Sequence, residues 1–430
     1  MAGAFDNIHP GLSQAEAIRL LMEPVDQLAS QSDPYMAAAH LINFPGHQTE
    51  SALLALVQDS DQSQPRRLAR RKAVEVLGRL GCVDATLTIG ECLKSDDPYL
   101  VENAAFSLQL LNCQDSDIHQ QMIGLLNDPA QNQRVLIQTL AALAVQDALP
   151  VIQSFQDLES PGVRGAAISA AVRLGGPREP LSELGPLMLA PNQMDRQTAI
   201  QDAINAGAVE LLPQILEAPV SPVFRMRAVR SLWPINEFNV AQLRLIAVLD
   251  ALIEDRPESL QLVHAYDQEP SDEFLVQEFF GTDFGRGYLA LQTLQQRSAE
   301  KLWPLLLERW NHDGNNDYGA HYFFVRLFGA IGSWPDEAQS VIREILLDAI
   351  TTRRPQFMKS KPAAVLAMGR MGLANVSEQM NCWLDPDQTP SWEARYAAIM
   401  VAPVSMLSSS LADPEPFVVA RVRESLKLRA

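Results

Sequence analysis

The sequence has few cysteines, no long hydrophobic run and no recognisable targeting segment. Its four cysteines include no Cys-x-x-Cys pair, which excludes a disulfide framework and zinc-ligand spacing. No apolar run approaches the ~18 residues that a membrane-spanning helix needs. Residues 1–10 lack the basic and apolar regions of a signal peptide. We therefore expect a reduced, soluble, cytoplasmic chain without membrane insertion.

Positive charge is also scarce. The 34 Lys and Arg residues stand against 52 Asp and Glu residues, for a net charge of −18. A nucleic-acid-binding protein needs a basic surface to displace counterions from phosphates, so we expect no nucleic acid partner. The same balance argues against docking on anionic lipid. Hydrophobic residues make up 47% of the chain, which is enough for a large core and excludes wholesale disorder.

The short motifs of several enzyme classes are missing. The chain contains no Gly-x-Gly-x-x-Gly, no phosphate-binding loop ending in Gly-Lys-Ser/Thr and no Gly-x-Ser-x-Gly. None of the seven histidines is followed by Glu, as a helical-repeat dinuclear metal site would require. We therefore expect no metal site, and any chemistry must be of a kind without a short universal motif.

Evenly spaced prolines are present instead. Seven of them are separated by 31, 33, 31, 32, 30 and 31 residues. Most follow an Asp or Ser, and proline in the first helical turn sacrifices only an N–H that has no partner. The spacing therefore predicts that a helix begins at each of the following positions: Pro34, Pro65, Pro98, Pro129, Pro161, Pro191 and Pro222.

An Ala-rich amphipathic stretch ending in Gly follows these prolines, as in 71–81 and 165–175. A second, shorter apolar stretch completes each repeat. Small residues allow close helix packing, and the trailing Gly ends the helix. Two helices in about 31 residues, repeated, predict an all-α fold, an α-solenoid of stacked helical hairpins. No segment shows the alternation that would require strands.

The repeat is regular over 30–235 and irregular over 236–310, and it resumes in degenerate form over 311–430. Residues 362–372 repeat the Ala-rich signature of 71–81. With no evident linker, we predict a single α-solenoid over 1–430. In its last third the patterns predict helices over the following ranges: 318–332, 337–350, 362–372, 392–401 and 418–428.

Two consecutive repeats carry a more specific signature. Residues 70–81 read Arg-Arg-Lys-Ala-Val-Glu-Val-Leu-Gly-Arg-Leu-Gly, and 97–108 read Asp-Pro-Tyr-Leu-Val-Glu-Asn-Ala-Ala-Phe-Ser-Leu. This tandem resembles the HEAT-like repeats of the phycobilin lyases of E/F type, which serve the light-harvesting phycobilisome of cyanobacteria. The ending over 413–426 looks like another such repeat. The length is similar to that of the fused-size lyases that act on phycoerythrins.

The resemblance implies attachment of phycoerythrobilin, by a thioether bond, to a cysteine of a phycoerythrin subunit, most simply α. The bilin would be substrate, with no permanently bound cofactor. Some relatives also isomerise the bilin, to phycourobilin or phycoviolobilin. The phycoviolobilin-forming ones carry Asn-His-Cys, where this chain has Asp313 after Asn311 and His312, so isomerisation stays open. The alternative is a non-catalytic HEAT-repeat adaptor that binds a protein partner in its concave groove.

A bilin lyase needs cations for two propionates, apolar cover for the rings and a carboxylate near the pyrrole nitrogens. The segment 313–326 offers these groups, and we expect Asp317, Tyr318 and His321 to be catalytic. Tyr322 and Arg326 are expected to bind the bilin. On a helix, residues four apart share a face, as do Tyr318 and Tyr322. The alternative is that Asp317 only caps the helix and the tyrosines pack in the core.

Two further groups are expected to bind the bilin. Asp283, Arg286 and Tyr288 stand in a glycine-rich stretch, which could equally be a plain turn between helices. Arg230 and Trp233, with neighbouring arginines, suggest a propionate clamp, although a solvated charged face with a core Trp fits the same pattern. A pocket lined by aromatic and Arg side chains near 283–326 would favour the lyase, and a long, open, acidic groove would favour the adaptor.

Overall fold

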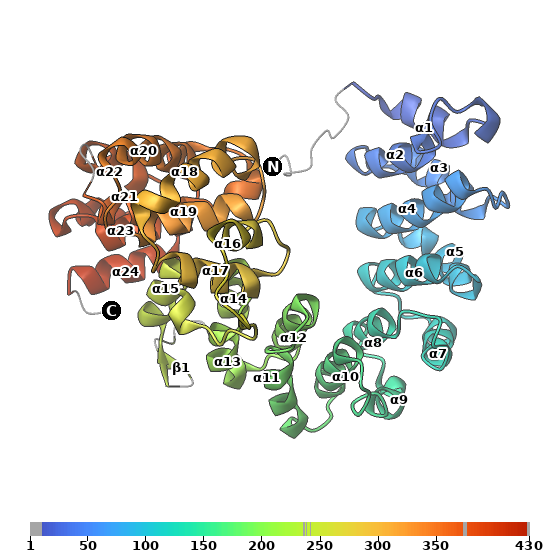
Figure 1. Ribbon diagram of the computed structural model, residues 1–430. Coiled ribbons are helices and arrows are strands. Elements are labelled where there is room, and N and C mark those ends of the chain that lie inside the picture. Colours follow the sequence, from blue (N-terminus) through green and yellow to red (C-terminus); the bar gives the residue numbers. More distant parts are fainter. Residues whose placement is uncertain (1–10, 235–236, 238, 241, 373–375, 428–430) are drawn as a thin grey trace. The chain divides into compact units, whose positions relative to one another are not determined.

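The chain forms two helical units (Figure 1). The computed structural model describes residues 11–234, 237, 239–240, 242–372 and 376–427. Unit 1 comprises the residues up to Leu181, and unit 2 those from Ser182. Among the described residues almost all regular structure is helical, which confirms the all-α prediction. The boundary lies inside the regular repeats, so the single solenoid over the whole chain stays a prediction.

Unit 1 is a two-layered stack of short helices. α2, α4, α6, α8 and α10 pack in order, each against the next, and α3, α5, α7 and α9 lie against them. The helices are α1 (Gln14–Met22), α2 (Asp33–His40), α3 (His47–Gln58), α4 (Gln64–Leu80), α5 (Thr86–Glu91), α6 (Pro98–Leu110), α7 (Ser116–Leu125), α8 (Gln133–Ala142), α9 (Leu149–Gln153) and α10 (Pro161–Arg173).

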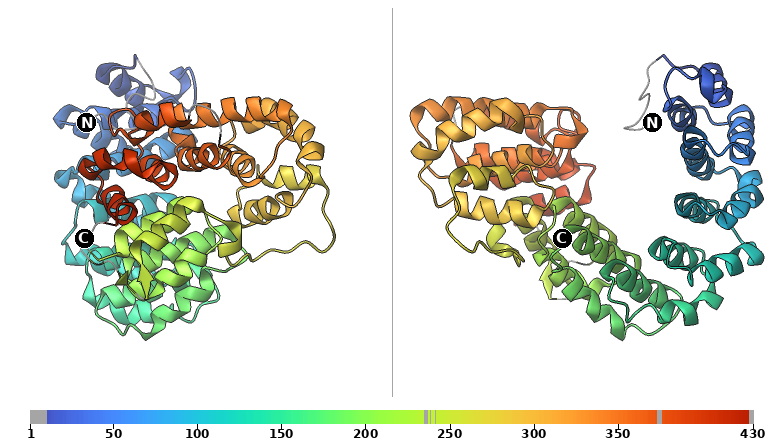
Figure 2. Two further views of the ribbon diagram at one scale, coloured as in Figure 1. Left: turned by 90° about the vertical axis from the view of Figure 1, so that its left-hand side faces the viewer. Right: turned by 45° about the vertical axis from the view of Figure 1, so that its right-hand side comes forward.

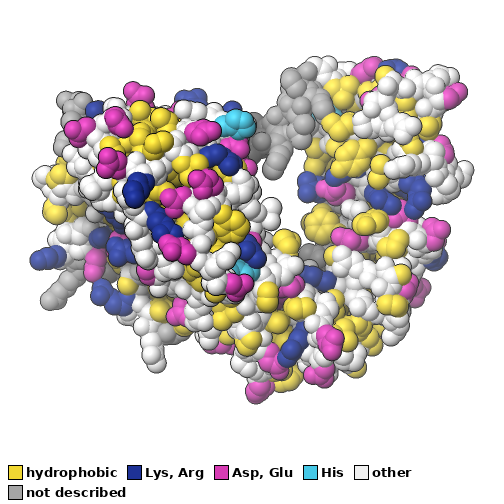
Figure 3. Space-filling model, viewed as in Figure 1, with side chains coloured by type: hydrophobic (Ala, Val, Ile, Leu, Met, Phe, Trp, Pro, Cys, Tyr) yellow, Lys and Arg dark blue, Asp and Glu magenta, His cyan; other side chains and the backbone are white. Residues whose placement is uncertain are grey.

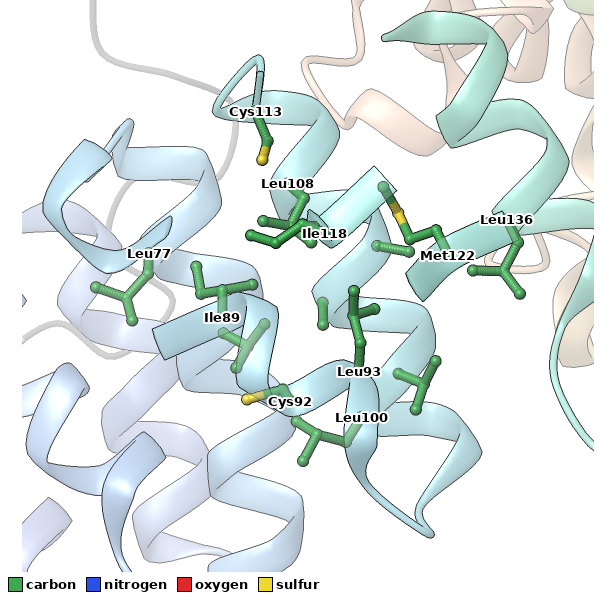
Figure 4. Packing of buried hydrophobic residues seen from close by; sticks show 14 of the residues in the cluster. Leu77, Ile89, Cys92, Leu93, Leu100, Leu108, Cys113, Ile118, Met122 and Leu136 are labelled. Atoms are coloured by element: carbon green, nitrogen blue, oxygen red, sulfur yellow. The ribbon is translucent and has the colours of Figure 1, made fainter. Parts of the chain in front are cut away.

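The core of unit 1 lies between these layers. Leu, Ile, Val and Ala side chains from successive repeats form one buried cluster, and Figure 4 shows the thiols of Cys92 and Cys113 among them. Cys92 and Cys113 are 8% and 3% exposed. Burial raises the pKa of the Cys92 thiol to about 11, so this cysteine is a packing residue rather than a nucleophile.

Most of the predicted helix starts are confirmed, because Pro34, Pro65, Pro98, Pro161 and Pro222 lie in the first turn of a helix. The predictions for Pro129 and Pro191 are wrong. Helix α8 begins at Gln133 and α12 at Gln193, each directly after an asparagine. The side chains of those asparagines, Asn132 and Asn192, accept the backbone N–H bonds that fix the first turn, so capping rather than proline sets these starts.

Unit 2 contains longer connections and one strand pair. Its elements are α11 (Leu184–Leu187), α12 (Gln193–Asn205), α13 (Leu212–Glu217), α14 (Pro222–Leu232), β1 (Asn239–Val240), β2 (Leu243–Arg244), α15 (Leu245–Glu254), α16 (Asp272–Glu278), α17 (Phe284–Leu294), α18 (Ala299–Arg309), α19 (Ala320–Ala330), α20 (Asp336–Thr351), α21 (Ser360–Arg370), α22 (Val376–Leu384), α23 (Trp392–Val401) and α24 (Pro416–Ser425). The helices predicted in the last third are thus confirmed to within a few residues, apart from residue 428, which lies outside the described ranges.

Short turns of helix connect these elements. They are η1 (Val25–Gln27), η2 (Leu41–Asn43), η3 (Val83–Ala85), η4 (Cys92–Lys94), η5 (Gln146–Ala148), η6 (Glu179–Glu183), η7 (Val209–Leu211), η8 (Pro257–Ser259), η10 (Pro355–Phe357), η11 (Val404–Ala412) and the π-helical η9 (Trp310–Gly314). The antiparallel pair β1–β2 corrects the expectation that no strands are present. The turn between the two strands includes Gln242, whose φ of +65° is a left-handed conformation. The alternation of apolar and polar residues in the sequence did not predict this turn.

Helix α15 holds unit 2 together across a long stretch of sequence. The later helices α17, α19, α21, α23 and α24 pack in order. In Figure 2 the yellow, orange and red helices of unit 2 lie close together. α15 follows α14 in the chain and packs against α21, α23 and α24. The helices over 222–254 therefore lie beside helices that come more than a hundred residues later.

Glycines set the closeness of successive helices in both units. A Cβ at Gly78 would lie 2.7 Å from that of Ser107, one at Gly329 would lie 2.5 Å from that of Ala367, and one at Gly369 would lie 2.6 Å from that of Val401. These contacts join α4 to α6, α19 to α21 and α21 to α23. The second glycine of the repeated signature, Gly81 or Gly372, has φ +71° or +57° and ends its helix, as predicted.

The surface carries both signs of charge. On the face drawn in Figure 3, acidic and basic side chains are interspersed, without one large acidic area. None of the described helices combines the length and the hydrophobicity that crossing a membrane requires.

Candidate functional site

A pocket of about 560 Å³ opens in unit 2 where α14 and α15 meet α19, α21 and α23. Much of its wall is apolar, from the side chains of Val223, Met226, Leu252, Ile253, Met358 and Ala363. The prolines that begin α14 and η10 also contribute, as does Pro362 of α21. A largely apolar concavity with a few polar groups is the usual form of a small-molecule site, and this volume suits a ligand of several rings.

Cationic side chains line part of this pocket. Arg227 and Arg230 lie one turn apart on α14, and Lys359 comes just before α21. Arg227 donates to the side chain of Gln201 at 2.6 Å, and Arg230 pairs with Glu415 at 3.2 Å. A carboxylate, Glu393 of α23, also lines the pocket. The predicted Arg230 is thus at the site together with two cations that can receive an anionic group.

Two tyrosines complete the wall. Tyr318 and Tyr322 both line the pocket, Tyr322 from α19 and Tyr318 from the turn before it. Tyr318 is 54% exposed, with its ring over the Lys359 amine at 3.3 Å, whereas Tyr322 is 2% exposed. Tyr318 is therefore accessible to a ligand along its ring and hydroxyl, whereas Tyr322 offers mainly its ring.

Behind this wall lies a buried polar cluster centred on Asp255, the residue that ends α15. Its carboxylate pairs with Arg225 and accepts bonds from the hydroxyls of Tyr288, at 2.7 Å, and Tyr322. Arg326 donates to the Asp255 carbonyl at 2.7 Å. Asp255 has φ +45°, which directs its side chain and its carbonyl to partners on three other helices. The cluster ties α14, α15, α17 and α19 into one frame for the pocket.

The charges in this cluster are compensated. Burial favours the neutral form of Asp255, but the Arg225 and Arg326 guanidiniums and the two tyrosine hydroxyls outweigh it and hold its pKa below the usual range. Burial and the nearby carboxylate raise the pKa values of Tyr288 and Tyr322 well above 10. The phenols are therefore neutral donors. Tyr288 and Arg326, which the sequence suggested for bilin binding, lie outside the pocket lining and instead position Tyr322 and the helix ends.

Asp317 and His321, expected to be catalytic, have other partners. The Asp317 carboxylate accepts two backbone N–H bonds at 2.8 Å, from Gly319 and Ala320, and so caps α19. The His321 imidazole is 2% exposed, stacks on Phe357 and shares a 2.9 Å hydrogen bond with Ser360. Neither side chain lines the pocket, although Asp317 adjoins Tyr318 in the chain.

Burial of His321 makes unit 2 sensitive to acid. Burial, then the charges of Lys359 and Arg354, lower its pKa from 6.5 to about 4. Unfolded chains then bind one more proton than folded ones between about pH 4 and pH 6.5, so stability present above that window is lost as the pH falls through it. We expect the His321 imidazole to lower the free energy of unfolding by about 3 kcal/mol as the pH falls from 6.5 to about 4.

The measurement is urea unfolding, followed by tryptophan fluorescence, at several pH values across that window. His321→Gln should show a flatter pH dependence than the wild type. His312→Gln is the matched control, because the His312 side chain is 81% exposed. Equal slopes for the two variants would contradict the assignment.

The remaining predicted residues lie elsewhere in unit 2. Asp283 caps α17 and pairs with Arg196 and His264, so it has a structural network of its own. Arg286 is on the surface, 3.6 Å from Glu278. Trp233 donates its indole N–H to a backbone carbonyl at 2.7 Å. None of these three predicted residues lines the pocket.

Sequence reasoning missed Lys359 and Asp255. Lys359 belongs to a Lys-Ser-Lys run at the start of an Ala-rich helix, where the repeat pattern predicts apolar residues. These unexpected lysines were the feature of the sequence that could have indicated a site. Asp255 directly follows the strongly apolar α15, and no sequence pattern indicates its buried partners. Among the described residues, no three His, Cys, Asp or Glu side chains gather closely enough to hold a metal ion.

The sequence is similar to two known proteins over most of its length. No family model matches the chain. It is 42% identical over 417 residues to the bilin biosynthesis protein CpeY of Synechococcus sp. strain WH8020, covering 94% of this chain and 100% of that protein. It is 34% identical over 391 residues to the uncharacterized phycocyanin operon protein Y of Pseudanabaena tenuis strain PCC 7409, covering 90% and 91% of the two.

A third relative is the phycocyanobilin lyase subunit alpha of Nostoc sp. strain PCC 7120. It is 28% identical over 199 residues, which cover 43% of this chain and 71% of that protein. The first two alignments span nearly the whole chain. The chain therefore belongs to the HEAT-repeat phycobilin lyase family of E/F type.

Proposed function

We propose that this protein is a bilin lyase that holds phycoerythrobilin in the pocket of unit 2 and attaches it to a cysteine of a phycoerythrin subunit, most simply α. The observation that carries the proposal is the pocket itself: about 560 Å³, largely apolar, with Arg227, Arg230 and Lys359 at its wall. A linear tetrapyrrole is a flat conjugated molecule with two propionates, so it needs this combination of apolar cover and cations. Family membership supports the same chemistry.

The reaction adds a cysteine S–H across a conjugated carbon–carbon double bond of the bilin. A carbon–sulfur bond forms, and the neighbouring carbon receives a proton, so no oxidant or reductant is needed. The protein's contribution is to hold the bilin and the acceptor thiol in one geometry and to exclude water from the rings. Tyr318 is the exposed hydroxyl of the wall and the group that we assign to hydrogen bonding with the bilin. Asp317 positions it by capping α19.

Isomerisation to phycourobilin would require the pocket to transfer a proton as well as hold the bilin. A proton must leave one carbon and reach another, carried by groups within hydrogen-bond reach. Tyr318, Lys359 and Glu393 line the pocket and carry groups that can exchange protons with a ligand. The buried imidazole of His321 does not line the pocket and is assigned no proton transfer.

The adaptor hypothesis has less support. An adaptor is expected to have a long, open, acidic groove, whereas the pocket is compact and its charged groups are mainly cationic. The lyase hypothesis called for aromatic and Arg side chains near 283–326. Tyr318 and Tyr322 meet that expectation, and the arginines come from α14 instead.

The test is coexpression with phycoerythrobilin-forming enzymes and a phycoerythrin α subunit in a bacterium without bilins of its own. We expect the purified, denatured α subunit to retain bilin absorbance, and to lose it when this protein is omitted or when the acceptor cysteine is replaced by serine. Absorbance of phycoerythrobilin indicates a lyase, and the shorter-wavelength absorbance of phycourobilin indicates a lyase-isomerase. Colourless subunits from several phycobiliproteins would contradict the proposal.

A further inference from the structure

The Lys359 side chain is buried at the pocket wall without a hydrogen-bond partner. It is 9% exposed, and in the described structure no acceptor meets its amine. Arg227 and Arg230, the other cations of the pocket, already donate to Gln201 and Glu415. A buried amine without an acceptor is destabilising. Lys359 is thus the one cation among the described pocket residues whose donors are all unused.

Aromatic rings surround the amine. It lies 3.3 Å from the ring centre of Tyr318, 4.7 Å from that of Phe284 and 5.6 Å from that of Tyr322. Ring faces attract a cation and hold it in place without occupying its N–H groups. The amine therefore stays fixed at the pocket wall with its hydrogens available.

Burial and a nearby charge shift the pKa of Lys359 in opposite directions. Burial lowers its pKa to about 7, and the charge of Asp317 opposes that effect. The other titratable and charged groups that face this region are His321, Tyr318 and Tyr322 of the α19 segment, with Arg227, Arg230 and Glu393 across the pocket. Around neutral pH the tyrosines and His321 are uncharged, whereas Lys359 titrates there because of its lowered pKa.

We propose that the Lys359 ammonium binds one propionate carboxylate of the bilin, an assignment that rests on the proposed function and identifies the group that holds one end of the substrate. The carboxylate supplies the acceptor that the amine lacks, and the partly buried pair is shielded from water by Tyr318. The second propionate is left to Arg227 and Arg230. A carboxylate beside the amine favours its charged form, so the bilin binds with uptake of a proton whenever free Lys359 is neutral.

The test measures the dissociation constant of the full-length protein for phycoerythrobilin between about pH 6 and pH 8, from the change in bilin absorbance. Over this range the charged fraction of a group with a pKa of about 7 falls about tenfold. We therefore expect the dissociation constant of the wild type to rise about tenfold. Phycoerythrobilin dimethyl ester, whose propionates carry no charge, should bind more weakly and without this pH dependence.

Variants separate Lys359 from other titrating groups. Lys359→Met should remove the pH dependence and bind phycoerythrobilin about as weakly at pH 6 as the wild type does at pH 8. Lys361→Met is the matched control, because Lys361 is also buried and two residues away but does not line the pocket, and it should retain the wild-type profile. Circular dichroism verifies that both variants fold, and the comparison of free acid with ester in the wild type needs no variant.

The outcomes distinguish this inference from the proposed function. If the wild type binds phycoerythrobilin with the same constant at pH 6 and pH 8, or binds the ester equally well, the assignment of Lys359 is wrong while the lyase proposal stands. If the wild type binds neither compound at any pH, the pocket is not a bilin site and both fall.

Discussion

Replacing Asp255 by Asn is expected to lower the free energy of unfolding of unit 2 by about 3–5 kcal/mol. The Arg225 guanidinium would lose its partner while remaining buried, and two tyrosine hydroxyls would lose a charged acceptor. Asn is the informative substitution because it has nearly the shape of Asp and tolerates φ near +45°. The loss would then come from charge and hydrogen bonding, with little backbone strain.

Tryptophan fluorescence during urea unfolding measures this loss in the right unit. All six tryptophans follow residue 181, so the signal reports unit 2 alone. The control is Asp250→Asn on the same helix, where the carboxylate is 29% exposed and bonds to Arg421 and Tyr396. We expect that control to cost only about 1 kcal/mol. Equal losses in the two variants would show that the Asp255 cluster has no special role in holding the pocket's helices.

Reversing the charge of the α14 arginines should weaken bilin binding strongly. In Arg227→Glu/Arg230→Glu, two carboxylates replace the two cations that face the pocket. Arg230 is 43% exposed, so each lost attraction and each new repulsion is modest, and together they amount to about 2–3 kcal/mol. That free energy corresponds to about a 30- to 150-fold higher dissociation constant for phycoerythrobilin.

The measurement is again titration by bilin absorbance, followed by the yield of coloured α subunit on coexpression. The double variant Arg343→Glu/Arg423→Glu is the control, because it changes the net charge equally and neither residue lines the pocket. It should bind within about twofold of the wild type. If both double variants lose affinity equally, the effect comes from the overall negative charge, and the arginines of α14 are not a propionate clamp.

The repeats could be predicted because the relevant interactions are local. A proline or a capping side chain determines where a helix starts, and a glycine in the left-handed conformation determines where it ends, each within one turn of the chain. Helical spacing predicted that Tyr318 and Tyr322 share a face; both line the pocket, although Tyr318 lies in the turn before α19. Pro129 and Pro191 show the limit, since Asn132, three residues after the first, and Asn192, directly after the second, cap the helices instead.

The pocket could not be predicted, because it depends on helices that are distant in sequence. Leu252 and Ala363 face the same cavity only because α15 packs against α21 and α23. Periodicity marks both residues as apolar without saying which helix they meet. Arg326 and Tyr288 carry the groups expected of a bilin site, yet they contact Asp255 instead. No sequence pattern predicts the left-handed conformation of Asp255 that makes these contacts possible.

The glycine contacts between helices also constrain how such a chain can change during evolution. At Gly78, Gly329 and Gly369 no side chain fits while the facing Ser107, Ala367 and Val401 are in place. A single substitution at one of these glycines would separate two neighbouring helices before any compensating change arose. A smaller residue must therefore appear first at the facing position, wherever that position still has a side chain to lose. Divergence at these positions is therefore ordered in time: the facing residue becomes smaller first, and only then can the glycine gain a side chain.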